Sequence, residues 1–166
     1  MNNERKWILR GGRVLNPAPF CLIGIVNVTP DSFSDGGKYI DPRNAVAHGL
    51  RLLDEGAGML DLGAESTRPF AEPVPEGEEI ARLMPVVARL REQRPDAVLS
   101  VDTLKAGTAR AALEGGADII NDVSACVADP ALLDVLAEYK PGYVLMHSQG
   151  SPREMQVNPR YGNVVE

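Results

Sequence analysis

The sequence has 166 residues, which is room for a single domain. It carries 17 Lys and Arg against 23 Asp and Glu, and this acidity argues against a nucleic-acid partner, which needs a basic face. The 44% hydrophobic and 24% charged fractions exclude a disordered chain, and no apolar run approaches the roughly 20 residues of a membrane span. Because no secretory signal is recognisable, we expect a cytoplasmic protein without a membrane partner, in which Cys21 and Cys126 are ordinary thiols.

Short apolar runs alternate with amphipathic stretches along the chain. Residues 7–15 are typical of a small antiparallel hairpin, and the apolar run 22–28 predicts a strand that is buried on both faces. Asp41 is expected to cap a helix that begins at Pro42 and places Ala45, Leu52 and Leu53 on one face. The pattern then predicts strands at 59–62, 98–101, 119–120 and 143–146, and helices at 76–93, 105–114 and 131–138.

This alternation indicates right-handed crossovers and a parallel sheet of the α/β class. A five-stranded doubly wound sheet fits the length, whereas a TIM (β/α)8 barrel needs about 250 residues. The polar residues nevertheless favour the barrel, because each predicted strand ends in one of them, and catalytic groups collect at that rim: Asn27, Asp61, Asp102, Asn121 and His147. We therefore expect residues 1–166 to form one incomplete barrel domain of about five βα units. It ends after the fifth strand, either as a fragment or as a chain that another chain completes.

Two loops carry candidate phosphate and metal chemistry. Asn27 opens a loop rich in Ser, Asp and Gly, and its side-chain oxygen suits a hard cation such as Mg²⁺, although such a loop is also an ordinary surface turn. Arg68 follows the second predicted strand, and its planar guanidinium matches phosphate oxygens; the alternative is a solvated arginine.

Asp102 and Asn121 form the second candidate group. A carboxylate at a strand end is costly to bury unless donors satisfy it, and a neighbouring amide both donates and accepts hydrogen bonds. The pair suits a flat heterocycle whose edge mixes N–H groups and lone pairs, while the alternative is that Asp102 caps the helix that begins at Lys105. The two histidines, His48 and His147, lack ligand spacing and are expected to be structural or surface residues.

The motifs as a set resemble those of the dihydropteroate synthase family. Residues 22–37, LIGIVNVTPDSFSDGG, look like its first signature, and residues 61–69, DLGAESTRP, resemble its second. Residues 100–103, 120–123 and 146–150 are similar to the third, fourth and fifth strand ends. The likeness extends from about residue 7 to residue 165 and corresponds to the N-terminal portion of the family's barrel, about strands one to five.

The resemblance implies a Mg²⁺-dependent transferase of folate biosynthesis that is built on a TIM barrel. Such an enzyme joins 6-hydroxymethyl-7,8-dihydropterin diphosphate to 4-aminobenzoate and releases dihydropteroate and pyrophosphate. It implies a metal-binding role for Asn27, catalytic roles for Asp102 and Arg68, and substrate binding by Thr67, Arg68, Asp102, Asn121, Asp31, Phe33 and Pro69. The family's further binding groups on strands six to eight have no counterpart here.

Two other functions stay open beside this one. One is a pterin-binding methyltransferase-type barrel, against which the Thr-Pro-Asp-Ser-Phe-Ser-Asp loop argues because a methyl transfer has no diphosphate to coordinate. The other is a non-catalytic partner subunit of a synthase, against which the retained polar groups argue. The resemblance also implies a possible homodimer, and the incomplete barrel implies a possible completing chain.

Overall fold

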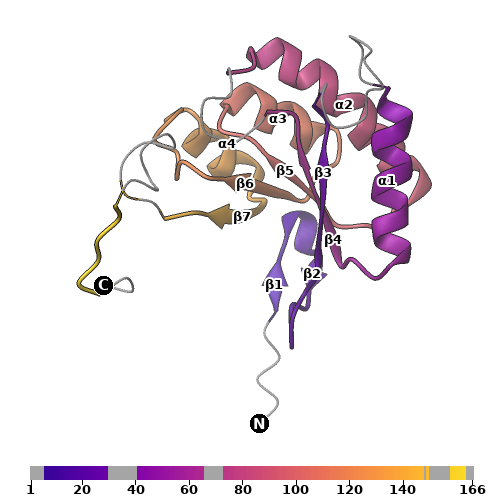
Figure 1. Cartoon of the computed structure of the whole chain (residues 1–166), viewed down its shortest axis with the longest axis horizontal. Coiled ribbons are helices and arrows are strands. Elements are labelled where there is room, and N and C mark those ends of the chain that lie inside the picture. Colours follow the sequence, from indigo (N-terminus) through magenta and orange to yellow (C-terminus); the bar gives the residue numbers. More distant parts are fainter. Residues whose placement is uncertain (1–5, 30–40, 66–72, 148, 150–157, 164–166) are drawn as a thin grey trace.

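The computed structural model describes residues 6–29, 41–65, 73–147, 149 and 158–163. A two-stranded antiparallel sheet pairs β1 with β2, and a five-stranded parallel sheet has the order β3-β4-β5-β6-β7 (Figure 1). The elements are β1 (Trp7–Ile8), η1 (Arg10–Gly12), β2 (Val14–Leu15), β3 (Ile23–Asn27), α1 (Pro42–Asp54), β4 (Met59–Gly63), α2 (Glu76–Gln93), β5 (Leu99–Asp102), α3 (Ala106–Glu114), β6 (Ile119–Asp122), α4 (Leu132–Tyr139) and β7 (Gly142–Leu145).

The predicted elements are confirmed, with bounds that shift by a residue or two. Asp41 caps α1 as expected, because its side chain accepts a hydrogen bond from the Arg43 amide at 2.9 Å. The N-terminal hairpin also forms, with Trp7 opposite Leu15. Within the described residues, no helix is both long and apolar enough to cross a membrane.

Helices α1 to α4 of the described residues pack on one face of the parallel sheet and bury the main core there (Figure 1). Alternate strand residues supply the sheet side of this core, namely Val26, Leu60, Leu62, Leu99, Val101 and Ile120. The opposite side is called the inner face. Its lower part, where the strands begin, holds Met59, Val98 and Ile119, which pack with Leu9 of the hairpin. The hairpin therefore covers the inner face at the amino ends of β4, β5 and β6 and leaves the carboxyl ends for other groups.

The prediction that residues 22–28 are buried on both faces is wrong. Burial alternates along β3, so that Gly24 and Val26 are buried while Ile23 and Ile25 are 52% and 61% exposed. The physical reason is position, because β3 is an edge strand of the described sheet and only its outer face is covered by α1.

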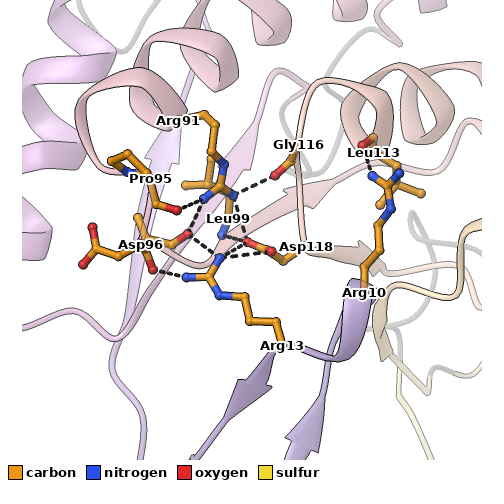
Figure 2. Close-up of polar contacts among 10 residues, drawn as sticks. Arg10, Arg13, Arg91, Pro95, Asp96, Leu99, Leu113, Gly116 and Asp118 are labelled. Carbon is orange, nitrogen blue, oxygen red and sulfur yellow. Dashed lines mark hydrogen bonds and ion pairs between the residues drawn. The ribbon is translucent and has the colours of Figure 1, made fainter.

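A buried acidic residue fixes the hairpin to the sheet. Asp118, just before β6, accepts hydrogen bonds from Arg13 of the hairpin at 3.1 Å, from Arg91 of α2 at 2.9 Å and from the Leu99 amide at 3.0 Å (Figure 2). Both arginines also donate to the Ala97 carbonyl oxygen. Three elements that are distant in the sequence are thus joined at the lower end of the sheet by one carboxylate and two guanidinium groups.

Candidate active site

Polar side chains occupy the upper part of the inner face, beyond the hairpin. In the parallel register, Asp61 pairs with Ser100, and Asp102 pairs with Gly63 on one side and Asn121 on the other. Since side chains alternate between faces with a period of two, Asp61, Ser100, Asp102 and Asn121 all lie on the inner face. The prediction that strand-end polar groups gather at one rim is therefore confirmed for the middle strands.

Asp61 is the hydrogen-bonding centre of this group. Its Oδ1 accepts from Ser100 Oγ at 2.6 Å, and its Oδ2 accepts from Asn121 Nδ2 at 2.9 Å. Ser100 is fully buried, so this bond satisfies a hydroxyl that has no access to water. Position 61 stands out in the sequence as a strand-end carboxylate, but its role in holding Asn121 depends on strand pairing and was not foreseen.

Asp102 has a different environment from Asp61. No residue that the structure describes donates a hydrogen bond to its carboxyl group. Burial and then the negative charges of Asp61, Glu79, Asp122 and Glu65 raise the pKa of Asp102 to about 7. A half-buried carboxyl group that has no donor among the described residues and is surrounded by like charges is poised to accept a hydrogen bond from a ligand or to take up a proton near neutral pH.

The alternative role for Asp102, as the cap of the following helix, is wrong. The amide of Lys105 donates to Thr103 Oγ1 at 3.2 Å, the Ala106 amide to Asp129 Oδ2 at 2.8 Å and the Gly107 amide to Glu76 Oε1 at 2.8 Å. Because these three side chains satisfy the Lys105 amide before α3 and the first two amides of α3, Asp102 is not needed there.

Gly63 keeps open a space between Asn27 and Asp102. A Cβ at position 63 would lie 3.8 Å from both Asn27 Oδ1 and Asp102 Oδ2, so two side-chain oxygens from β3 and β5 flank this glycine. Oxygen donors suit Mg²⁺, which keeps several waters and needs only one or two protein ligands when a substrate phosphate supplies the rest. The described residues contain no cluster of three or more His, Cys, Asp or Glu side chains that could hold a metal alone. The arrangement thus fits a cation that arrives with a phosphate-bearing substrate.

A second charged cluster lies beside the site, at the amino ends of α2 and α3. Lys105 Nζ contacts Glu65, which follows β4, and Glu79 of α2 at 2.7 Å. Burial alone would lower the pKa of Lys105, but the hydrogen bonds to the two carboxylates outweigh it and raise the pKa. The sequence does carry a signal for this cluster, because helical spacing places Glu79 on the same face as Leu83, Val86 and Leu90.

Several predicted site residues lie outside the described residues, namely Asp31, Phe33, Thr67, Arg68 and Pro69. His147 is exposed and contacts the ring of Tyr161, with ring centroids 5.5 Å apart. It therefore does not join the polar group, and its prediction as a structural or surface residue is confirmed.

The fold and the site together indicate the class of protein. It has a parallel α/β sheet that helices cover on its outer face, with polar side chains at the carboxyl ends of its strands. The profile of the pterin binding enzyme family matches residues 23–166, and the chain belongs to this family. Curated relatives include the dihydropteroate synthase of Mycobacterium leprae (strain TN), which is 47% identical over 149 residues, or 89% of this chain and 52% of that protein. The dihydropteroate synthase of Synechocystis sp. is 41% identical and covers 87% of this chain and 50% of its own length.

Solved structures agree with this membership. The Xanthomonas albilineans dihydropteroate synthase with 4-aminobenzoic acid has a TM-score of 0.78 and 48% identity, and covers 87% of this chain and 54% of its own. The Burkholderia cenocepacia enzyme complexed with 7,8-dihydropteroate has a TM-score of 0.79 and 38% identity, and covers 96% and 52%. The described sheet is therefore an incomplete TIM barrel, and the chain spans about half the length of the relatives it matches.

Proposed function

We propose that this chain carries the pterin-binding half of a dihydropteroate synthase. The reaction joins 6-hydroxymethyl-7,8-dihydropterin diphosphate to 4-aminobenzoate. The bond between the pterin methylene carbon and the diphosphate oxygen breaks, a bond to the aminobenzoate nitrogen forms, and that nitrogen loses a proton. The names of the curated relatives and the ligands of the solved relatives support this function.

The observation that carries the proposal is the pairing of Asp102 with Asn121 at the end of neighbouring strands. The Asp102 carboxyl group lacks a donor among the described residues, and Asn121 presents an amide beside it. A flat ring with an amino group and a ring N–H satisfies both. In its ionised form, Asp102 would also stabilise positive charge that develops on the pterin as the diphosphate leaves.

The phosphate end of the substrate belongs to the rim beside Asn27. Asn27 Oδ1 is a suitable ligand for Mg²⁺, and Asp102 Oδ2 lies on the other side of Gly63. Bound by Asn27, Mg²⁺ would supply positive charge to neutralise the departing pyrophosphate. The roles of Thr67 and Arg68 at the diphosphate, and of Asp31, Phe33 and Pro69 near the diphosphate or the aminobenzoate, rest on the sequence motifs.

The test is binding and turnover by the 166-residue chain. Calorimetry with pterin diphosphate and Mg²⁺ is expected to show binding that weakens by about tenfold or more in Asp102→Asn, because a buried polar contact is lost. The matched control is Asp134→Asn, an exposed position on α4, which should bind like the parent chain. Undiminished binding by Asp102→Asn contradicts the assignment of Asp102.

Turnover separates the remaining functions. Dihydropteroate formed from both substrates and followed by chromatography supports a synthase that is active without further strands. Binding without product assigns the missing chemistry to groups outside this chain. Mixing the chain with a complete synthase tests the alternative of a non-catalytic partner, which predicts co-elution and altered activity of the complete enzyme. The same elution profiles test the predicted homodimer.

A further inference from the structure

One carboxylate connects three neighbouring strands on the inner face. Asp61 of β4 accepts from Ser100 of β5 at 2.6 Å and from Asn121 of β6 at 2.9 Å. Only the bond to Asn121 involves a residue of the proposed pterin site. Asp61 thus contacts the site through a second side chain.

The bond determines which end of the Asn121 amide faces Asp61. The two ends of a carboxamide have nearly the same shape but opposite hydrogen-bonding character, one donating and the other accepting. An ionised carboxylate only accepts, so Nδ2 must point to Asp61. Rotating the amide by half a turn would bring Oδ1 against Oδ2 of Asp61, which places two acceptors in contact without a proton between them.

The opposite end of the amide is therefore the acceptor Oδ1. No residue that the structure describes donates a hydrogen bond to this atom. Asp102, the partner of Asn121 in the strand register, likewise lacks a donor among the described residues. Two acceptors from adjacent strands are thus left for a ligand, and a ring edge with N–H donors is complementary to both.

We propose that Asp61 is a positioning residue that fixes the Asn121 amide with its acceptor toward the ligand, and so makes the site select a donor-bearing ring edge. This inference rests on the proposed pterin-binding function. It goes beyond that function, because it assigns the selectivity of Asn121 to a residue that need not contact the ligand.

A merely structural role for Asp61 makes different predictions. If Asp61 only joined strands, then the loss of the Ser100 bond and the loss of the Asn121 bond should have similar effects. Ser100→Ala removes the first bond and leaves the second. Asp61→Asn keeps nearly the same volume and still bonds to Ser100, but its amide can present either an oxygen or an N–H to Asn121. The two variants therefore form a matched pair.

The first measurement is made without ligand. In ¹⁵N spectra of the full chain, the Asn121 side-chain amide protons are assigned by comparison with Asn121→Ala. One of them is expected to be shifted downfield and protected from exchange with water in the parent chain and in Ser100→Ala. Both properties should be lost in Asp61→Asn. Unchanged Asn121 signals in a folded Asp61→Asn overturn the proposal, whatever the chain binds.

The second measurement compares two rings that differ at one position. Pterin carries an amino donor at C2, and pteridin-4(3H)-one carries only a hydrogen there. The parent chain and Ser100→Ala are expected to prefer pterin, and Asp61→Asn should reduce the ratio of the two affinities by about tenfold, since the amide is free to turn. An unchanged ratio overturns the selectivity role. Failure of the parent chain to bind either ring contradicts the proposed function instead, while the amide spectra still decide whether Asp61 orients Asn121.

Discussion

Arg13 of the hairpin and Asp118, which precedes β6, form an ion pair with 3.1 Å between Nη1 and Oδ1. Asp118 is only 8% exposed and is shared with Arg91, so Asp118→Asn leaves two guanidinium groups without their common anion. We expect this change to lower the free energy of unfolding by about 3 kcal/mol. Urea denaturation followed by circular dichroism measures it.

An exposed ion pair supplies the control. Asp54 is 75% exposed and lies 3.0 Å from Arg94. Asp54→Asn should change the free energy of unfolding by less than about 1 kcal/mol, because water and salt screen such pairs. If the two variants were equally stable, Asp118 would not be the residue that fixes the hairpin to the sheet.

Substitutions in the cluster of Lys105, Glu65 and Glu79 are expected to have non-additive effects on the free energy of unfolding. Glu79 is 1% exposed, and its Oε2 accepts from Lys105 and Thr108. Lys105→Met leaves this buried carboxylate without a cation and should destabilise the chain by about 3 kcal/mol. The double variant Lys105→Met with Glu79→Leu should be more stable than Lys105→Met alone, because the buried charge has then been removed. Additive losses in thermal or urea unfolding would show that the ion pair does not couple the two residues.

The raised pKa of Asp102 predicts how stability depends on pH. The pKa of an unfolded aspartate is near 3.8, and that of Asp102 in the folded chain is about 7. Between these values the folded state binds more protons than the unfolded state, so the Asp102 contribution favours folding at low pH and is lost as the pH rises through about 7. In Asp102→Asn, the fall in unfolding free energy between pH 4.5 and pH 8 should be smaller by about 3 kcal/mol. An identical fall in both chains contradicts the raised pKa.

Gly63 and Gly142 give a prediction in which binding and stability respond differently. A Cβ at Gly63 meets only ordinary contacts of 3.7–3.8 Å, and it fills the space between Asn27 Oδ1 and Asp102 Oδ2. Gly63→Ala should therefore fold normally but weaken the binding of pterin diphosphate with Mg²⁺. At Gly142, by contrast, a Cβ would lie 2.7 Å from Leu9 and 2.8 Å from Ile119, so Gly142→Ala should cost about 1–3 kcal/mol of stability.

Calorimetry and unfolding of both glycine variants check this contrast. Normal binding by a folded Gly63→Ala would mean that the space between Asn27 and Asp102 is not part of the substrate site.

The order of the elements was predictable from local sequence patterns. Apolar runs, helical spacing and the cap at Asp41 all act over a few residues, so their effects are visible without the fold. The prediction that polar side chains gather at one rim is also confirmed for Asp61, Asp102 and Asn121, because the carboxyl ends of parallel strands must meet at one edge of a sheet.

Other features depended on what covers each element. The exposure of Ile23 and Ile25 follows from the edge position of β3, which no local pattern specifies. The capping of α3 by Asp129 and Glu76 involves residues from elsewhere in the chain, and it leaves Asp102 without that role. Helical spacing is consistent with a buried Glu79, but its partners Lys105 and Thr108 lie in another segment, at the start of α3.

By itself, the sequence determined the parallel α/β class, the succession of strands and helices and the motifs of the pterin-binding family, because these are written in local periodicity and in contiguous residues. Only the tertiary structure decided that Asp61 holds Asn121, that Asp102 lacks a donor among the described residues and has a pKa near neutrality, and that Asp118 fixes the hairpin. The physical reason is the short distance over which these interactions act. Hydrogen bonding and the desolvation of charge depend on groups brought within a few ångströms by strand pairing, and those groups lie tens of residues apart in the chain.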